Sequence, residues 1–379
     1  MAALVMASCW TDRPRFVRNL PSERFVLANG LRVILLEDAT APLVLLNSCV
    51  EGGAMDEPAG KTGLAHLVEH LAVRGFSRER AIEPGTFNNG ITDFDRTCFS
   101  QKLPSNRLES GLAVERERLE IKPTIEAQRF EEERRSVLQE MRERFAITIP
   151  SEGSENQAKP AGTSPFPSSW LLSVRSLIWP EFSSWDSLPL GRSSDVLGLQ
   201  PSDAERFLAD WYTPSNTTLV LVGAVKAASA RPLVEKWLGD LPARVPAKRR
   251  TLRRPERLTA ARKTISAGRD AKSVTFAWRV PTGLEEHAAE IQLLARLLGD
   301  HDHGRITMAF RTWGHPVLGA TTIVESEAGI GAMLVRVDLA PSTSLREAEG
   351  TLSQVIERLR TQSISQQEWE EVAALAEAR

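Results

Sequence analysis

Apolar residues along this chain change from strand-like alternation to helical spacing and back again. Strands are expected at residues 25–37, as a pair around an Asn-Gly turn, and at residues 43–50 and 87–101. Helical spacing is found at residues 62–74, 106–120 and 125–145. The last helix places Phe130, Val137, Met141 and Phe145 near one face, so we expect that face to pack on a core.

A similar order returns in the second part of the chain. Residues 149–169 are rich in Pro, Ser and Gly and are expected to form a loop. A helix at 201–211, with Ser202 as its N-cap, is followed by a strand at 216–225 and a helix at 228–239. Further strands are expected at residues 273–280, 317–325 and 332–339, and helices at residues 285–298, 305–313, 345–361 and 365–379. A Ser-x-x-Glu capping box from Ser365 to Glu368 opens the last helix.

Strands followed by helices, twice over, predict an α+β fold with two related halves rather than a βαβ series. Between the halves, residues 241–263 carry nine Lys and Arg against one acid, with three prolines. No aromatic residue interleaves there for base stacking, which favours a solvated linker over a nucleic-acid arm. The expected parts are an N-terminal tail (1–20), a first domain (21–240), the linker (241–263) and a second domain (264–379) that ends without a closing strand.

Composition excludes several classes of protein. Among 379 residues, 47 Lys and Arg stand against 49 Asp and Glu, so no basic field calls for nucleic acid. Apolar runs are far shorter than the roughly 20 residues of a membrane helix. Three cysteines are too few for a disulfide scaffold.

The first ten residues, MAALVMASCW, leave the compartment open. They lack the positive start of a signal peptide. One reading is the remnant of a lipoprotein signal that ends at Cys9, which would place the protein in the periplasm. The other reading is a loosely packed N-terminus of a cytoplasmic protein.

The pentapeptide His66-Leu67-Val68-Glu69-His70 points to metal chemistry. On a helix, His66 and His70 lie about one turn apart, so both imidazoles leave one face. That separation suits two ligands of one Zn²⁺. Glu69 lies beside them and can take a proton from a water at the metal without being a ligand. The pattern is H-x-x-E-H.

Two readings of this motif compete. With 6 His in the chain, a chance H-x-x-E-H is rare, on the order of 1%. The plain alternative is a pair of polar histidines on a half-exposed helix, which the apolar neighbours oppose because buried ionisable groups need a partner. A third ligand is required. The helix at 125–145 offers Glu133 and Glu140, two turns apart on one face, and composition does not decide between them.

From about residue 25 to its end, the chain resembles the pitrilysin, insulysin and mitochondrial processing peptidase family of zinc peptidases, the inverzincins. The family's zinc helix with its lead-in is similar to the segment GGAMDEPAGKTGLAHLVEHLAVRGF. Its opening hairpin is similar to NLPSERFVLANGLRVILLED, its edge strand to FNNGITDFDRTCF, and the end of its first half to WYTPSNTTLVLVGAV. The resemblance implies two halves, each a mostly antiparallel sheet covered by helices, that form a clamshell, with the second half shortened here.

The resemblance also implies individual roles. The family's third ligand belongs to an E-R-x-x-V-x-x-E-like run and falls on Glu140, 70 residues after His70. Glu133 matches the additional acid of that run, which supports the ligands. Asn89 matches the edge-strand Asn that helps to bind substrate. Arg311 matches an Arg of the second half that does the same, and the plain alternative for Arg311 is a charge on the surface of a helix.

One departure bears on partners. In the family, that Arg is followed seven residues later by a Tyr, but Leu318 stands there. The substrate-clamping pair is therefore incomplete. Because some family members work as pairs, we expect a homo- or heterodimer in which another family member supplies the Arg/Tyr half.

The function implied is that of a zinc metalloendopeptidase that hydrolyses peptides or unfolded segments. One Zn²⁺ per chain is held by His66, His70 and Glu140, and Glu69 serves as general base and acid. The alternative is a catalytically weak or silent interaction subunit of a heteromeric processing peptidase. The complete zinc motif argues against that alternative, because silent relatives usually lack it.

Overall fold

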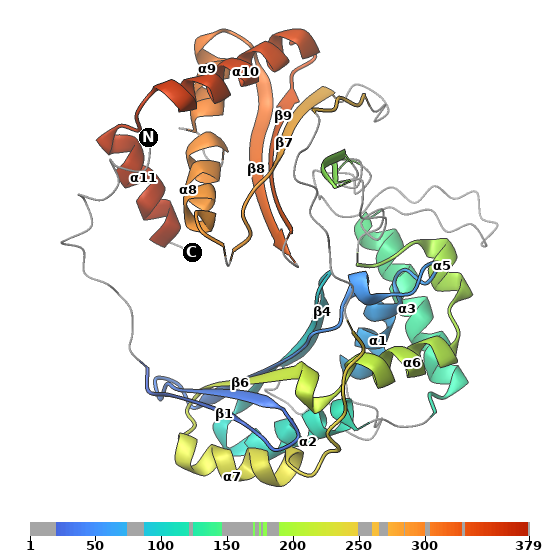
Figure 1. Ribbon diagram of the computed structural model, residues 1–379. Coiled ribbons are helices and arrows are strands. Elements are labelled where there is room, and N and C mark those ends of the chain that lie inside the picture. The colour runs from blue at the N-terminus through green and yellow to red at the C-terminus, as the bar shows by residue number, and fades with distance from the viewer. Residues whose placement is uncertain are drawn as a thin grey trace.

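The computed structural model describes residues 20–73, 87–120, 124–145, 170, 174–175, 177–179, 189–248, 260–264, 272–283, 285–299, 304–327 and 330–377. Within them the chain forms two units, each a β-sheet with helices on it (Figure 1). The first unit is drawn in blue to yellow and the second in orange and red. The α+β fold with two related halves is confirmed.

The first unit is built on a six-stranded sheet with the order β1-β2-β6-β3-β5-β4. Its strands are β1 (Ser22–Val26), β2 (Arg32–Glu37), β3 (Leu43–Val50), β4 (Phe87–Thr92), β5 (Thr97–Pro104) and β6 (Thr217–Gly223). Neighbouring strands are antiparallel except β2 and β6, which are parallel. The β1–β2 turn contains Gly30, whose φ of 89° is accessible to glycine at little cost. Among the described residues β4 pairs only with β5, so it is an edge strand.

Helices bury one face of this sheet. They are α1 (Leu64–Val73), α2 (Leu108–Leu119), α3 (Ala127–Phe145), α5 (Ser193–Gly198), α6 (Pro201–Trp211) and α7 (Ala227–Leu238). Helices α2 and α7 share one core with β2, β3 and β6, and α1, α3 and α6 share a second core. Phe130, Val137 and Met141 of α3 are fully buried in the second core, as their spacing predicts.

The second unit has a three-stranded antiparallel sheet with the order β7-β9-β8. Its strands are β7 (Lys272–Arg279), β8 (Val317–Glu327) and β9 (Ile330–Leu339), and its helices are α8 (Ala288–Gly299), α9 (Arg305–Thr312), α10 (Leu345–Thr361) and α11 (Gln366–Glu377). Helices α8, α9 and α10 share its apolar core with the sheet. The capping box at α11 is present, because Ser365 and Glu368 exchange side-chain to backbone hydrogen bonds.

Two sequence predictions were wrong in detail. Residues 87–101 do not form one strand but parts of two, because the chain turns back after Thr92 and the backbone N–H of Asp93 donates to the Arg96 carbonyl. The alternation of apolar and polar residues in the sequence continues through this turn, because the turn residue Phe94 is apolar and buried. Helix α6 is capped by Gln200 rather than Ser202, since Pro201 already occupies its first turn, where no backbone N–H is needed.

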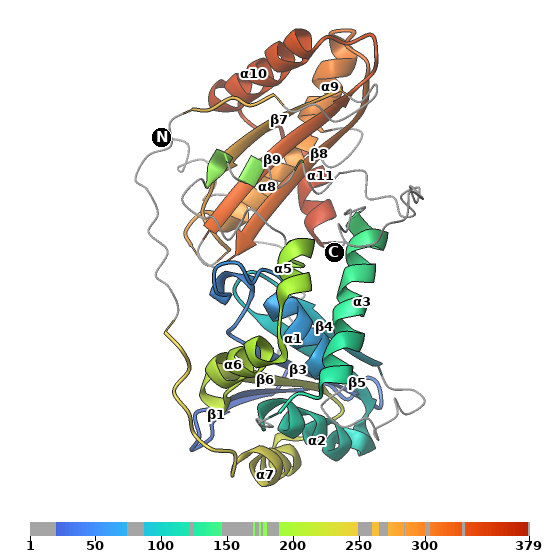
Figure 2. The same ribbon diagram turned by 90° about the vertical axis from the view of Figure 1, so that its right-hand side faces the viewer.

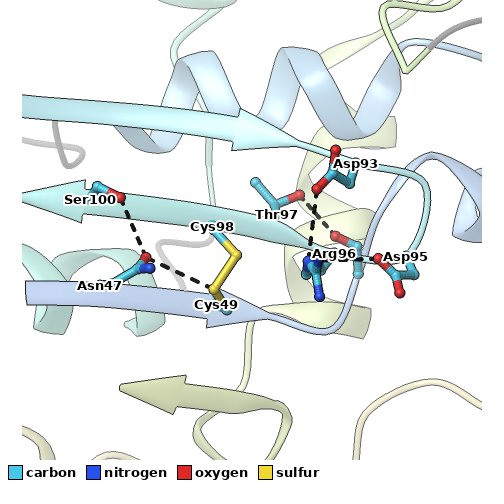
Figure 3. Close-up of a disulfide and its surroundings, with 9 residues drawn as sticks. Asn47, Cys49, Asp93, Asp95, Arg96, Thr97, Cys98 and Ser100 are labelled. Atoms are coloured by element: carbon cyan, nitrogen blue, oxygen red, sulfur yellow. Dashed lines mark hydrogen bonds and ion pairs between the residues drawn. A yellow bond between two sulfur atoms is a disulfide. The ribbon is translucent and has the colours of Figure 1, made fainter. Parts of the chain in front are cut away.

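Cys49 and Cys98 form a disulfide that the cysteine count did not suggest (Figure 3). They lie directly opposite one another in the β3–β5 ladder. Because side chains alternate along a strand, the disulfide lies on the sheet face opposite to the buried Val50 and Phe99, which is the face that the described helices of the first unit leave uncovered. Ser100 donates to the Asn47 side chain on the same face.

The described residues of segment 170–179 contact both units. The Trp170 indole donates to the Thr275 hydroxyl of β7, and the Arg175 guanidinium pairs with Glu325 of β8 at 2.6 Å. Residues Val174, Ile178 and Trp179 pack between the first unit and the second sheet. Figures 1 and 2 show the described residues of this segment, in green, against the sheet face opposite to α8.

Several predictions fall outside the described residues. These are the N-terminal tail with Cys9, the loop at 149–169 and the middle of the linker at 241–263. Linker residue Arg244 lies against the first unit and donates to the Tyr212 carbonyl. A membrane-spanning helix is not found in the part of the chain that the structure describes, since none of its helices combines the required length with enough apolar residues.

Candidate metal centre

Helix α1 carries the H-x-x-E-H motif and is held at its N-terminus by a buried carboxylate. Glu57 accepts the backbone N–H groups of Gly63 at 3.1 Å and Ala65 at 2.8 Å. A carboxylate at this end complements the helix dipole and supplies a cap that the helix itself lacks. Burial raises the pKa of Glu57 well above its ordinary value. The backbone just before His66 is thereby fixed.

Helix α3 packs against α1 and brings its acids to the histidines. Phe130, Val137 and Met141 of α3 share a core with Leu67 and Leu71 of α1. With that apolar stripe facing α1, Glu133 and Glu140 lie on the near side of α3 and both reach His70. The residues alone did not decide which of the two acids is the third ligand. In the structure Glu140 lies near Nε2 of both histidines, and Glu133 lies near Nδ1 of His70.

His66, His70 and Glu140 form a group that fits a metal ion. Their ligand atoms all lie within 4.8 Å of one another. Oε2 of Glu140 is 3.6 Å from Nε2 of His66 and 3.4 Å from Nε2 of His70. Two ligands at about 2.0–2.1 Å from a tetrahedral zinc are separated by about 3.4 Å. Two imidazoles and one carboxylate match the donor set of a catalytic zinc site, which keeps its fourth position open.

Glu133 lies behind His70. Its Oε2 is 3.4 Å from Nδ1 of His70, on the side of the ring away from Glu140. A carboxylate in that position fixes the ring orientation and makes the other nitrogen a better ligand. Burial opposes protonation, but hydrogen bonds to Glu133 and Glu140 outweigh it and raise the pKa of His70 to about 9. The carboxylates around His70 therefore favour a positive charge at this place.

Glu69 points from α1 toward β4. Thr92 donates its hydroxyl hydrogen to Oε2 of Glu69 at 2.8 Å. A Cβ on residue 90 would lie 2.5 Å from Oε1 of Glu69, so Gly90 makes room for the carboxylate. Burial raises the pKa of Glu69 from its ordinary value, against the Thr92 hydrogen bond. A carboxylic acid with a raised pKa is better matched to proton transfer near neutral pH.

The two predicted substrate-binding residues lie apart from one another. Asn89 is exposed on the edge strand β4, beside Gly90 but on the opposite sheet face. Arg311 is exposed near the end of α9 in the second unit. It lines a cavity of about 670 Å³ with His315 and Leu318, whose lining includes none of the three clustered residues.

Sequence reasoning missed three residues of this centre, namely Glu57, Gly90 and Thr92. A signal was available for one of them. A single glycine inside a strand commonly marks a place where another group approaches the backbone closely. Glu57 and Thr92 act through contacts that no local pattern encodes.

Comparison with known proteins bears on this centre. Residues 32–146 match the model for "Insulinase (Peptidase family M16)", and residues 198–375 match the model for "Peptidase M16 inactive domain". The first match contains His66, Glu69, His70 and Glu140. Together the two matches cover most of the chain.

Curated relatives cover part of the chain. The chloroplastic stromal processing peptidase of Oryza sativa subsp. indica is 28% identical over 207 residues, which are 52% of this chain and 15% of that protein. The "Probable zinc protease PqqL" of Escherichia coli (strain K12) is 26% identical over 241 residues, which are 59% of this chain and 24% of that protein. The chain thus matches less than half the length of these relatives.

Solved structures share the fold over nearly the whole chain. A protease from Helicobacter pylori superposes with a TM-score of 0.76 at 19% identity, over 95% of this chain and 84% of that one. The first half of the periplasmic protease PqqL from Escherichia coli superposes with a TM-score of 0.68 at 20% identity, over 94% of this chain and 76% of that one. With both family models matched in order along it, the chain belongs to the M16 family of peptidases.

Proposed function

We propose that this chain is a zinc metalloendopeptidase that hydrolyses peptides or unfolded segments. The observation that carries the proposal is the convergence of His66, His70 and Glu140, from two helices far apart in sequence, beside the buried Glu69. Relatives named zinc proteases support the choice of zinc.

Each residue has a distinct part in the proposed reaction. His66, His70 and Glu140 hold one Zn²⁺, and Glu133 orients His70. Zinc, when bound, makes a water more acidic and polarises the substrate carbonyl. Glu69 accepts a proton from the attacking water and returns it to the leaving amine nitrogen. Thr92 keeps the Glu69 carboxylate directed during both transfers.

The substrate class follows from strand β4. The outer edge of β4 lies beside the Glu69 carboxylate, which packs against Gly90. Backbone N–H and C=O groups on this edge can hydrogen-bond to an extended peptide, which would then form an additional strand of the sheet. A peptide must be extended to pair in this way, so flexible peptides are favoured over folded proteins. Asn89 is proposed to contact the bound peptide. We propose that Arg311 contacts the bound peptide only in an assembly in which the second unit of another copy lies beside the metal centre.

Replacing Glu69 by Gln tests the mechanism. The substitution keeps the side chain's size and removes its ability to take a proton, so hydrolysis of an unstructured fluorogenic peptide should be lost. Zinc content should stay at the wild-type level, because Glu69 is not a ligand. Glu109→Gln is the control, since Glu109 is an exposed surface residue of α2. Full hydrolysis by Glu69→Gln would refute the mechanism.

The alternative is a catalytically weak or silent interaction subunit. The match of residues 198–375 to an inactive-domain model is the observation that favours it. A zinc titration combined with the peptide assay separates the two. A silent subunit would bind zinc weakly or cleave nothing in any mixture, whereas the proposed peptidase binds zinc and cleaves peptide with a suitable partner.

A partner is proposed to complete the active site. The chain superposes on 94% of its length with the first half of a longer protease, and covers 39% of that protease's full chain. Leu318 stands where the family resemblance calls for a Tyr. We therefore propose that a second M16 chain with that Tyr supplies the Arg/Tyr half in a heterodimer. A homodimer would bring Arg311 alone, because another copy of this chain carries the same Leu318.

For the compartment we propose an oxidising one such as the periplasm. The Cys49–Cys98 disulfide would be reduced in most cytoplasmic environments. The PqqL protein of Escherichia coli is described as periplasmic. Thiol alkylation of protein taken from its host without reductant should leave Cys49 and Cys98 unmodified, and alkylation of both would place the protein in a reducing compartment.

A further inference from the structure

Arg118 of α2 is a buried cation at the junction of α1 and β4. Its side chain is 1% exposed. Nε donates to the Ala72 carbonyl at 2.9 Å and Nη2 to the Val73 carbonyl at 2.6 Å, both in the last turn of α1. Nη2 also donates to Oδ1 of Asn88 on β4 at 2.9 Å. One guanidinium therefore connects the end of the motif helix to the edge strand.

Asn88 makes the same connection from the strand side. Its Nδ2 donates to the Val73 carbonyl, which also accepts from Arg118. The three groups form a closed set of hydrogen bonds between α1, α2 and β4. The planar Arg118 guanidinium suits such a junction because it donates from two nitrogens in fixed directions. A lysine at this position would supply only a compact charge without that fixed geometry.

The charge of Arg118 is balanced within the fold. Glu115, one turn earlier on α2, pairs with it and is itself 1% exposed. Gln101 of β5 donates to the same Glu115 oxygen, and the Phe99 ring lies 4.4 Å from the guanidinium carbon. Burying an ion pair is costly and seldom the best way to gain stability. The buried Arg118–Glu115 pair is better explained by the position in which it holds the Arg118 guanidinium, between α1 and β4.

That geometry concerns Glu69. Residues 74–86 separate α1 from β4 in sequence, so chain connectivity alone does not set the position of the strand on the helix. Asn88, Gly90 and Thr92 share one face of β4, the face toward α1. The junction at Asn88 therefore sets the distance at which Gly90 and Thr92 meet the Glu69 carboxylate.

We propose that Arg118 is a positioning residue, which fixes β4 against the end of α1 and thereby holds Glu69 and the peptide-binding edge in register. Its catalytic consequence rests on the proposed peptidase function. Its structural consequence, a strand held by one buried guanidinium and one amide, stands without that function.

Two variants and a control test the proposal. Asn88→Ala removes the strand's side of the junction and leaves the Arg118–Glu115 pair in place, so the fold should persist. Arg118→Lys keeps the charge and loses the fork. Arg116→Lys is the control, because Arg116 lies on the same helix but pairs with Asp240, away from α1.

Hydrogen exchange is the first readout. In Asn88→Ala and Arg118→Lys, amides of residues 87–92 should exchange about tenfold faster than in the wild type, while those of β1 stay unchanged. The Arg116→Lys protein should match the wild type. Unchanged exchange at 87–92 in both variants would overturn the proposal, and this outcome does not depend on any activity.

Kinetics of the zinc-loaded proteins, with a partner chain if one is needed, are the second readout. Each variant should lose about tenfold in kcat at unchanged zinc content, because an ångström of misplacement is costly in an active site. A merely structural role would lower the melting temperature and leave kcat of the folded protein unchanged, which would overturn the catalytic part. If the wild type itself hydrolyses nothing, the peptidase proposal fails, while the exchange result still decides the junction.

Discussion

Thr92 holds Glu69 from a neighbouring strand, and its hydroxyl is the only part of it that the proposed chemistry uses. The hydrogen bond of 2.8 Å leaves Oε2 pointing at β4, with Oε1 packed beside Gly90. A general base performs best when its carboxylate is already directed at the proton. Thr92 and Gly90 therefore hold the Glu69 carboxylate in one direction before any substrate binds.

Thr92→Val should lower kcat by about ten- to a hundredfold with little change in KM, because it keeps the shape and removes the hydroxyl. Thr92→Ser should restore most of the activity, since it returns the donor. Both proteins should bind zinc as the wild type does. Steady-state kinetics on one peptide measure this, and a Thr92→Val protein with the kcat of the wild type would show that the hydrogen bond is unimportant.

At this scale the sequence predicted the residues whose spacing carries the signal. His66, Glu69 and His70 lie within one helical turn, so their convergence can be read directly. The choice of Glu140 as ligand came from family resemblance, since Glu133 shares its face. Thr92 and Glu57 could not be found, because their partners depend on how β4 and the lead-in fold back on α1.

The ends of helices are set by local chemistry, and α11 is an example with a pH dependence. Arg305 of α9 forms two hydrogen bonds with the Glu368 carboxylate, at 2.7 and 3.0 Å. Glu368 also accepts from the backbone of Ser365 in the capping box. The Arg305 hydrogen bond lowers the pKa of Glu368 to about 2 from an ordinary 4.5.

A carboxyl group whose pKa is lower in the folded than in the unfolded protein stabilises the fold at pH values above its ordinary pKa. This stabilisation is lost as the pH falls through the lower pKa of the folded protein, because the carboxylate becomes protonated there. Glu368→Gln should therefore lower the free energy of unfolding at pH 7 by about 1 kcal/mol. The deficit relative to the wild type should shrink as the pH falls from 4.5 toward 2.

Urea unfolding at several pH values measures this difference. Glu370→Gln is the matched control on the same helix, where the exposed carboxylate accepts a hydrogen bond from Gln366. A Glu368→Gln deficit that stays constant down to pH 3 would contradict the assignment of the pKa shift to this ion pair.

Elements bounded by clear stops were predicted well. The strand at 43–50 and the helices at 201–211 and 345–361 have the expected limits, since caps, glycines or polar residues close each apolar pattern. The hairpin at 87–104 was missed because Phe94, in its turn, is buried between the two units rather than exposed. Tertiary packing there produced an apolar residue where a turn would normally be polar.

On the scale of the whole molecule, segment 170–179, as far as the structure describes it, contacts both units. It belongs to the first unit by sequence but covers the second sheet, through the Arg175–Glu325 pair and the packing of Trp179. No periodicity foretold this, because the contact depends on how two sheets meet. The described part of the chain therefore offers a candidate metal centre with a second unit fixed beside it.

The partner proposal gives a prediction at this scale. The chain alone should cleave an unstructured peptide weakly, and addition of an M16 chain with an intact Arg/Tyr pair should raise the rate. The rise should depend on the partner's concentration and saturate. Equal rates for the chain alone and for every mixture would show that no second half is needed.

Two imidazoles and one distant carboxylate are proposed to hold a single zinc ion, and the zinc content of the purified protein shows whether they do. Purified wild-type protein and the exposed-site control Glu143→Gln should each contain about one zinc per chain, and Glu140→Gln should contain far less. Wild-type protein without zinc, or a Glu140→Gln protein that retains it in full, would show that these three residues do not form a zinc site.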